Sequence, residues 1–258
     1  MKDHSKTGIL LTFCFAAFMC IAMTGCTTNP QNADGGDIYD PLEDVNRATF
    51  AINDALDQAA VRPVAKAYRA VTPKFLRDSV TNFLRNLHSP INVANQILQG
   101  DIEGAAGDVS RFMINTSIGV GGLFDVAADT GLEYEHEDFG QTLGVWGIAH
   151  GPYLVLPVIG PSSFRDATGL LVDTFADPVR LYLYNTDQEE WYYARAIATG
   201  IEKREALLDA LDDLRTNSFD YYAAVRSAYM QKREAMVRDD DPEQMSAPAI
   251  PDYDDEDY

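Results

Sequence analysis

DFGQTLGVWGIAHGPYLVLPVIGPSSFRD, residues 138–166, is the segment that decides how this 258-residue chain can fold. Four glycines recur in it at helical spacing and predict a flat helix face that allows close backbone approach: Gly140, Gly144, Gly147 and Gly151. Three prolines then end regular helix and leave residues 153–159 extended or looped: Pro152, Pro157 and Pro161. In hydrocarbon, irregular backbone persists only where protein buries it or where it lines a wet cavity. The segment therefore indicates the wall of a passage or, equally well, a buried crossing in a soluble core.

Helix start and stop signals recur on both sides of this segment. Helices are expected over residues 42–59, 63–71, 73–88, 90–100, 101–118, 163–176, 189–214 and 218–238, with a further segment starting at Pro178. Few stretches alternate with period two and no good hairpin turn is evident, which predicts an all-α protein. The helices are many, short and often started by proline, so an up-down bundle is not expected. Several have broad apolar faces, which fits contact with lipid as well as a soluble helical core.

The N-terminus predicts an exported lipoprotein. A short basic region precedes an apolar run over residues 8–23, which falls short of the ~18 or more apolar residues of a spanning helix. The run ends in Met-Thr-Gly-Cys26, which resembles a bacterial lipobox with methionine in place of the usual leucine, valine or isoleucine. Residues 1–25 are therefore expected to be a signal peptide and Cys26 the lipid attachment site. An ordinary cleaved secretory signal is the alternative.

Lipidation would also set the location. A single acyl chain binds membranes weakly, at ~10⁴ M⁻¹, whereas three chains would anchor the protein permanently. Thr27 follows the cysteine, where an aspartate would favour the inner membrane, so we expect the periplasmic face of the outer membrane. Residues 26–37 are expected to be a lipidated tether. All three cysteines lie within the first 26 residues, so no disulfide is expected in this oxidising compartment.

The C-terminal residues 239–258 hold nine acidic side chains and no basic one. They are expected to form a disordered acidic tail, because such a composition cannot bury a core. Residues 38–238 then form one helical domain that is long enough for a sizeable core. The formal net charge is −20, and nucleic-acid binding is not expected of an exported acidic chain.

One stretch of the body reverses this acidic balance. Residues 61–87 hold six basic side chains and one acidic one. Three of the basic residues share a helical face opposite an apolar one: Arg62, Lys66 and Arg69. They are candidates for contact with the headgroups of an anionic leaflet. The alternative, which we favour slightly, is that they pair with acidic side chains of the protein itself.

The central segment also resembles a known family. Its matching pieces are DFGQTLG at 138–144, WG at 146–147, GPYL at 151–154, LP at 156–157 and GPS at 160–162. Further matching pieces are Asp40-Pro41-Leu42-Glu43, Asn46-Arg47, Pro63-Val64-Ala65, Leu98-Gln99-Gly100 and Arg111-Phe112. Together they are similar to the MlaA (VacJ) family of outer-membrane lipoproteins, and the resemblance covers residues 38–235. The acidic tail lies outside the family pattern.

The resemblance implies a ring of short amphipathic helices in the inner leaflet of the outer membrane, around an amphipathic channel. It implies that misplaced outer-leaflet phospholipids pass through this channel to a soluble periplasmic carrier, MlaC, which maintains lipid asymmetry. It also implies a trimeric outer-membrane porin as a partner. Separately, no cofactor or metal is expected, because the chain shows no nucleotide-binding motif and no second cluster of His or Cys ligands. Our candidates for the channel or lipid path are Phe139, Gly140, Gly144, Trp146, Gly147, Gly151, Tyr153, Leu154, Pro157 and Pro161.

Three functions other than transport fit parts of the sequence less well. A non-transporting lipoprotein scaffold for a periplasmic complex would not need an irregular apolar wall. A lipase would use Ser162 or Ser163 with His150 and Asp166, but the chain lacks the G-x-S-x-G motif and the serines fit a helix N-cap. The acidic run 133–138 could bind a cation, although a solvated loop is favoured because EF-hand spacing is absent.

Overall fold

The computed structural model describes residues 38–240, which lie in a compact unit that begins at Ile38. The signal peptide, Cys26, the tether and the tail beyond residue 240 fall outside the described residues, so what we expect of them stays a prediction. The described chain is mostly helical, which confirms the all-α prediction. Its elements are α2 (Glu43–Leu56), a π-helical turn (Asp57–Val61), α3 (Arg62–Val71), α4 (Lys74–Gln99), α5 (Ile102–Ser117), a 3₁₀ turn (Ala128–Thr130), α6 (Phe139–Val145), β1 (Tyr153–Leu156), β2 (Gly160–Ser163), α7 (Phe164–Ala176), α8 (Pro178–Asn185), α9 (Glu189–Ala206), α10 (Leu208–Asn217) and α11 (Tyr221–Arg238).

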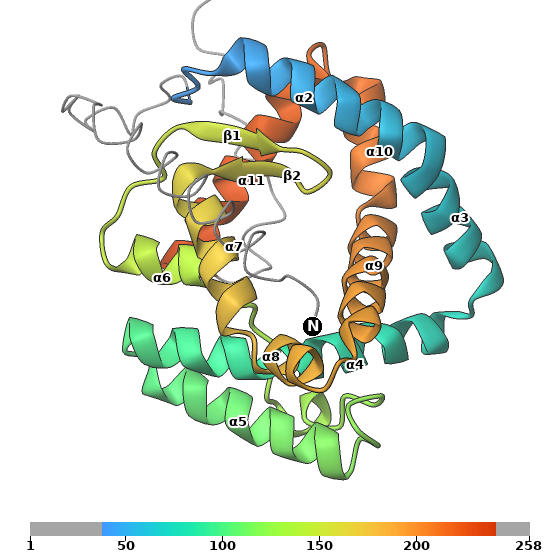
Figure 1. Cartoon of the computed structure of the whole chain (residues 1–258), viewed down its shortest axis with the longest axis vertical. Helices are drawn as coiled ribbons and strands as arrows, with labels where there is room; N and C mark the ends of the chain where they lie inside the picture. The colour runs from blue at the N-terminus through green and yellow to red at the C-terminus, as the bar shows by residue number, and fades with distance from the viewer. Residues whose placement is uncertain (1–37, 241–258) are drawn as a thin grey trace, which may run out of the picture. The chain divides into compact units, whose positions relative to one another are not determined.

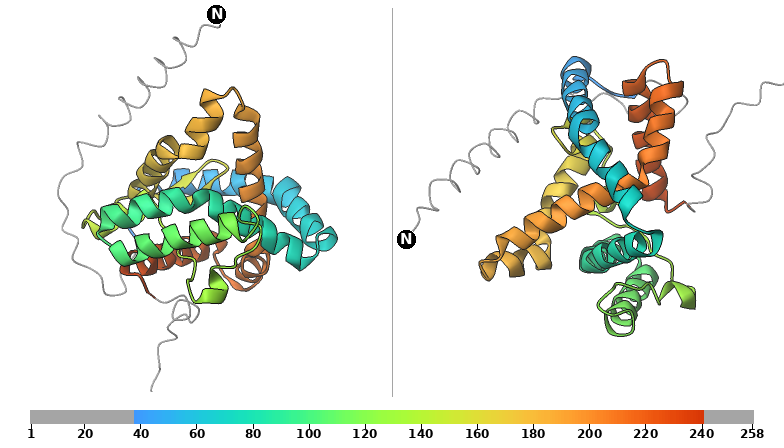
Figure 2. Two further views of the ribbon diagram at one scale, coloured as in Figure 1. Left: turned by 90° about the horizontal axis from the view of Figure 1, so that it is seen from below. Right: turned by 90° about the vertical axis from the view of Figure 1, so that its right-hand side faces the viewer.

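Within residues 38–240 the helices follow a ring-like course (Figure 1). In Figure 1, α2 crosses the top, α3 descends on the right and α4 lies along the bottom, and α9 packs against α3. The pair α4 and α5 lies side by side in both views of Figure 2. On the left of Figure 1, α6 packs against α7, α11 and α4, and both α7 and α11 lie next to the β1–β2 hairpin. The predicted ring of short helices is therefore present, whereas a channel through it remains a proposal.

Two helix boundaries differ from the prediction, beginning with α4. This helix continues through Pro90, which was expected to start a new helix. Proline removes one backbone donor and crowds the preceding turn. Side chains on both sides of it nevertheless fix the helix, because Asn86 Nδ2 donates to Thr116 Oγ1 at 3.0 Å and Asn92 Nδ2 donates to Glu135 O at 2.6 Å. Tertiary contacts thus override the local signal.

The second difference lies in the predicted 189–214 helix, which is two helices. Leu207 leaves helical geometry (ψ 5°), and α10 begins at Leu208. The change in direction lets Leu208 pack inward, where it is only 2% exposed. Two predicted helix caps are confirmed, since Asp101 accepts a hydrogen bond from Gly104 N at 2.9 Å and Ser163 accepts one from Asp166 N at 3.1 Å.

The sequence predicted no hairpin, and this prediction is wrong. Strands β1 and β2 pair antiparallel, with Tyr153 opposite Ser163 and Leu156 opposite Gly160. The turn at residues 157–159 places Val158 at φ 68°, a left-handed conformation that is uncommon for a β-branched residue. Such a turn carries none of the Asn-Gly or Asp-Gly signals by which hairpins are recognised.

Two asparagines of α2 explain why this short hairpin forms. Asn46 Nδ2 donates to Tyr153 O at 2.9 Å, and its Oδ1 accepts from Val155 N at 2.9 Å. Asn53 lies two turns later on the same helix face. It repeats this double hydrogen bond at the end of β1 and in the turn, at 2.9 and 2.8 Å. The helix thereby satisfies the outer edge of β1, which would otherwise need another strand.

Candidate functional site

The central segment begins as a short helix and continues as irregular backbone. Asp138 caps α6, since its carboxylate accepts the backbone N–H three residues on at 2.9 Å. Of the four glycines, only Gly140 and Gly144 lie within α6. Gly147 (φ 85°) follows the C-cap of α6 in the left-handed conformation that ends helices. Gly151 (φ 67°) is also left-handed but lies in the loop before β1. The predicted four-glycine helix face is therefore wrong beyond its first two members.

Those two glycines do allow the close approach that the spacing predicted. A Cβ placed on Gly169 of α7 would lie 2.2 Å from the backbone nitrogen of Gly140, so α6 and α7 touch through their backbones. A Cβ on Gly144 would lie 2.7 Å from the side chain of Val237 in α11. The centre of the segment is consequently locked between α7 and α11.

A buried ionic network joins the same three helices. Arg233 of α11 is 8% exposed, and its guanidinium donates to both carboxylate oxygens of Asp138, at 2.6 and 2.9 Å. It also donates to Asp166 Oδ1 at 2.9 Å, while Tyr229 OH donates to the other oxygen of Asp166 at 2.7 Å. Sequence patterns gave no sign of Arg233, because its partners lie 95 and 67 residues away along the chain.

The network sets the ionisation of its neighbours. Burial alone would raise the pKa of Asp138, but the hydrogen bonds and charge of Arg233 outweigh it and lower the pKa to about 2. The adjacent Glu137 has no such cation. Burial raises its pKa to about 7, although Gln99 hydrogen-bonds to its carboxylate. The pKa values of these adjacent carboxyl groups are therefore shifted in opposite directions, because only Asp138 has an arginine partner.

Helix α4 buries its polar face and exposes apolar side chains, the inverse of an amphipathic helix in a soluble protein. Its buried face is polar apart from Ile91: Asn86, Ser89, Asn92, Asn95 and Gln96. Its exposed side chains include large apolar ones: Phe75, Leu76, Phe83, Ile97 and Leu98. The buried amides anchor the central segment, as when Asn95 donates to Asp173 Oδ1 at 3.1 Å and accepts from Thr142 Oγ1 at 2.9 Å.

The same inversion extends over the rest of residues 38–240, where buried polar and charged side chains outnumber buried apolar ones. Large apolar side chains are more than half exposed on several helices: Val45, Ile52, Val71, Ile102, Met113 and Ile197. Soluble proteins rarely expose apolar side chains over so many elements. This surface fits an apolar surrounding medium. Within residues 38–240 no helix combines the length and apolar character needed to span a membrane.

The ten residues predicted for the lipid path fall into three groups. Buried ones are Gly140 and Tyr153; half-buried ones are Phe139, Gly144, Leu154 and Pro161; exposed ones are Trp146, Gly147, Gly151 and Pro157. Tyr153 is 0% exposed and packs with Val155 and Tyr222, so it belongs to the core. Trp146 is placed on the outside, where Nε1 donates to Leu98 O at 2.9 Å.

The three basic residues predicted for headgroup contact are paired with acids. Arg62 donates to both oxygens of Asp212, at 3.0 and 2.8 Å, and Lys66 Nζ lies 3.4 Å from the same carboxylate. Arg69 donates to Glu205 Oε1 at 2.7 Å and to Asp209. The structure therefore favours the alternative that the sequence left open, in which this face joins α3 to α9 and α10.

The residues considered for a lipase do not form its geometry. Ser163 is 0% exposed and caps α7, and Ser162 donates to Ser163 O at 3.3 Å. His150 Nδ1 lies 3.9 Å from Asp166 Oδ2 and has no hydrogen-bond partner. Among residues 38–240, no group of three or more His, Cys, Asp or Glu side chains is arranged to hold a metal ion.

Comparison with known proteins assigns this arrangement to a family. The model of the family described as MlaA lipoprotein matches residues 38–236, which includes the hairpin, both asparagines and the Asp138–Arg233 network. The chain belongs to the MlaA lipoprotein family. The helices with buried polar faces and the central segment both lie within the residues that the family model matches.

Relatives in the MlaA family include both named and uncharacterised proteins. The chain is 35% identical over 216 residues to the intermembrane phospholipid transport system lipoprotein MlaA of Escherichia coli, with 82% of this chain and 83% of that one covered. It is 31% identical to the Haemophilus influenzae protein of that name, covering 91% and 92%. An uncharacterised Rickettsia prowazekii protein is 39% identical, covering 78% and 79%.

A solved structure matches the MlaA-family chain with a TM-score of 0.68 and 38% sequence identity. The match covers 77% of this chain and 98% of that one. That solved structure is described as a "structural basis for maintenance of bacterial outer membrane lipid asymmetry". At this identity, the likeness supports a shared arrangement of the helices as well as shared ancestry.

Proposed function

We propose that this protein is anchored through Cys26 to the periplasmic face of the outer membrane and transports phospholipid. It would take misplaced phospholipids from the outer leaflet along a polar-lined path and pass them to a periplasmic carrier. A trimeric porin would be its partner in the membrane. Loss of the protein would then let phospholipids accumulate in the outer leaflet. The observation that carries the proposal is the inverted amphipathicity of residues 38–240, which fits a body surrounded by lipid.

The apolar exterior supports membrane residence without a spanning helix. Val71 is 78% exposed and Ile52 is 69% exposed, on adjoining helices. Burying apolar area in acyl chains stabilises a membrane-bound body by roughly 25 cal/mol per Å². Helices whose apolar faces point outward can therefore lie in the lipid while the acyl anchor prevents escape.

The polar interior supports a path for headgroups. A phospholipid that crosses unaided must carry a charged headgroup through hydrocarbon, where even one ionised side chain costs ~2.5–3.5 kcal/mol or more. A polar-lined path removes most of this barrier while the tails stay among lipids. Trp146, Gly147, Gly151 and Pro157, the exposed candidates of the central segment, are proposed to border it. A passive path conducts both ways, so the affinity of the carrier would set the direction.

The first test measures outer-leaflet phospholipid in a strain that lacks the protein. Outer-leaflet phospholipid should rise in that strain, the wild-type gene should restore it, and Cys26→Ala should not. Equal phospholipid levels with and without the protein would refute the transport proposal. If Cys26→Ala restored the level fully, the anchor would be dispensable and that part of the proposal would be wrong.

A second test separates transport from a scaffold role. Ile52→Lys places a charge on the apolar exterior, whereas Gln58→Lys adds the same charge at an exposed polar position nearby. A lysine in the centre of a bilayer costs about 2.5–3.5 kcal/mol, so Ile52→Lys should impair phospholipid clearance and membrane retention. Gln58→Lys should do neither. A scaffold held by its acyl anchor alone would tolerate both changes equally.

A further inference from the structure

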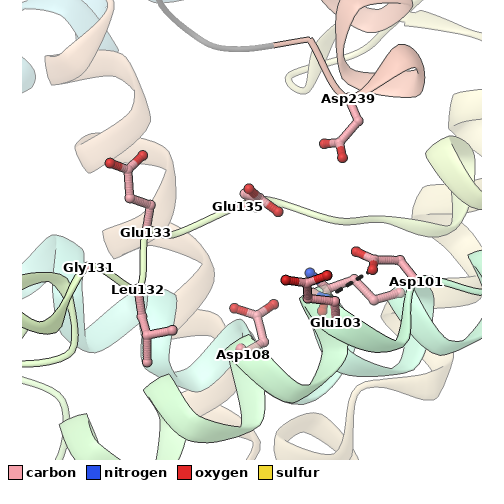
Figure 3. Close-up of a pocket in the computed structure, with 11 residues that line it drawn as sticks. Asp101, Glu103, Asp108, Gly131, Leu132, Glu133, Glu135 and Asp239 are labelled. Carbon is pink, nitrogen blue, oxygen red and sulfur yellow. Dashed lines mark hydrogen bonds between the residues drawn. The ribbon is translucent and has the colours of Figure 1, made fainter.

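An acidic hollow lies outside the central segment (Figure 3). It is formed between the first turns of α5 and the loop that follows the 3₁₀ turn. Its volume is about 370 Å³. Residues from α4, α5, the 131–135 loop and the end of α11 line it, and no basic side chain is among them. Its carboxylates are Asp101, Glu103, Asp108, Glu133, Glu135 and Asp239.

The floor of this acidic hollow contains buried oxygen atoms without partners. Asp108 is 3% exposed, its carboxylate points into the hollow in Figure 3, and its Oδ2 has no hydrogen-bond partner. Gln96 is 2% exposed, and its Oε1 also has no partner. A buried polar atom without a hydrogen bond costs about 1–3 kcal/mol, and more when it is charged. These two acceptors therefore indicate a ligand that donates hydrogen bonds.

Nearby cations of the chain are engaged elsewhere. Arg111, one turn after Asp108 on α5, donates to Asp125 and to Leu132 O. Arg238, at the end of α11, pairs with Asp240 at 2.8 Å. Burial raises the pKa of Asp108 to about 6, and hydrogen bonds from side chains lower it only in part. Within residues 38–240 no counter-charge lines the acidic hollow, although the charge of nearby Arg111 also lowers the pKa of Asp108.

The remainder of the mature chain cannot supply that counter-charge either. Residues 26–37 and 241–258 contain no lysine, arginine or histidine. The basic residues before Cys26 belong to the predicted signal peptide. A cation in the acidic hollow must therefore come from another molecule.

The chemistry of the acidic hollow restricts that molecule. A compact metal ion does not fit, because no three carboxylates among the described residues converge on one point. A zwitterionic headgroup would bring a phosphate, for which the lining offers no cation. The volume equals that of about twelve water molecules at roughly 30 Å³ each, which is enough for an alkyl chain that carries several ammonium groups.

We propose that this acidic hollow binds a linear polyamine. One ammonium group donates to Asp108 and Gln96 at the floor, since an ammonium has three donors and no acceptor. The other ammonium groups contact the carboxylates of Glu133 and Glu135 on the opposite wall. This binding is independent of phospholipid transport, so either proposal can fail without the other.

The test uses the mature, lipidated full-length protein in detergent micelles, with spermidine as the probe. Calorimetric titration should show saturable binding to the wild type. Asp108→Asn keeps the size of the side chain but removes its charge, and it should weaken binding about tenfold or more. The matched control is Asp78→Asn, which removes an equal charge from an exposed carboxylate that pairs with Lys74 outside the hollow.

The control should bind spermidine like the wild type. The double variant Glu133→Gln/Glu135→Gln alters only exposed wall residues, so it tests the site even if Asp108→Asn disturbs folding. It should also bind more weakly. Three results would overturn the proposal: no saturable binding to the wild type, equal weakening by Asp78→Asn, or equally tight binding of Mg²⁺ at matched ionic strength.

Discussion

Replacing Arg233 with methionine tests whether the buried network holds the central segment in place. Methionine keeps a long, flexible side chain but lacks the guanidinium that donates three hydrogen bonds, to Asp138 and Asp166. Asp138, which is mostly buried, would then lose its cation, whereas Asp166 would keep the hydrogen bond from Arg165 at 3.1 Å. Because Asp138 also caps α6, the loss would loosen the joint between α6, α7 and α11.

The expected magnitude follows from the burial of the network. Arg233 is 8% exposed, and the side chain of Asp138 is 22% exposed. Removing one partner of a buried ion pair destabilises a protein by about 3–5 kcal/mol, since the remaining charge stays buried. For a domain of this length, each kcal/mol lowers the melting temperature by about 2–4 °C. Arg233→Met should therefore lower it by roughly 6–20 °C.

Thermal unfolding in detergent, followed by circular dichroism at pH 7, measures this change. Arg238→Met is the control, because that arginine lies on the surface and pairs only with Asp240; it should leave the melting temperature unchanged. Adding Asp138→Asn to Arg233→Met removes the stranded charge and should recover most of the loss, while Asp166 keeps its pair with Arg165. A loss below about 2 °C, or no recovery in the double variant, would refute the reasoning.

Three further changes test other parts of the structure. Asn46→Ala should lower the free energy of unfolding by about 1–3 kcal/mol, because the backbone groups of the hairpin lose their partners. The control Thr49→Ala, which loses only a hydrogen bond within α2, should have little effect. Urea unfolding measures both variants. Gly169→Ala forces α6 and α7 apart and should reduce soluble yield, while Gly200→Ala, whose Cβ meets open space, should not. Burial raises the pKa of Glu137 to about 7, so the wild type should lose stability as pH rises from about 4.5 to 7. Glu137→Gln should flatten that profile in melting curves, and an unchanged profile would contradict the assignment.

Much of the fold could be predicted because its signals are local. Helix caps such as Asp101 and Ser163, together with apolar periodicity, place most helices within a few residues. The motif at 138–166 was specific enough to indicate the family from the residues alone. Apolar faces broader than a soluble core requires also pointed to contact with lipid, although the sequence left a soluble helical core open.

The errors arose where distant residues decide local structure. Pro90 lies inside α4, because Asn86 and Asn92 bind segments that follow much later in the chain. The hairpin exists because Asn46 supplies hydrogen bonds from 107 residues away. Periodicity and turn signals describe neighbours in the chain, so such contacts leave no trace in them.

For the candidate site, too, some features follow from the sequence and others only from tertiary contacts. The sequence by itself determined the helical class and the glycines that allow α6 to approach its neighbours, and it predicts the lipobox at Cys26. Only the tertiary structure decided that Arg62 is neutralised by Asp212, and that the polar face of α4 is the buried one. The physical reason is that periodicity shows which residues share a face, whereas burial and charge pairing depend on what that face contacts.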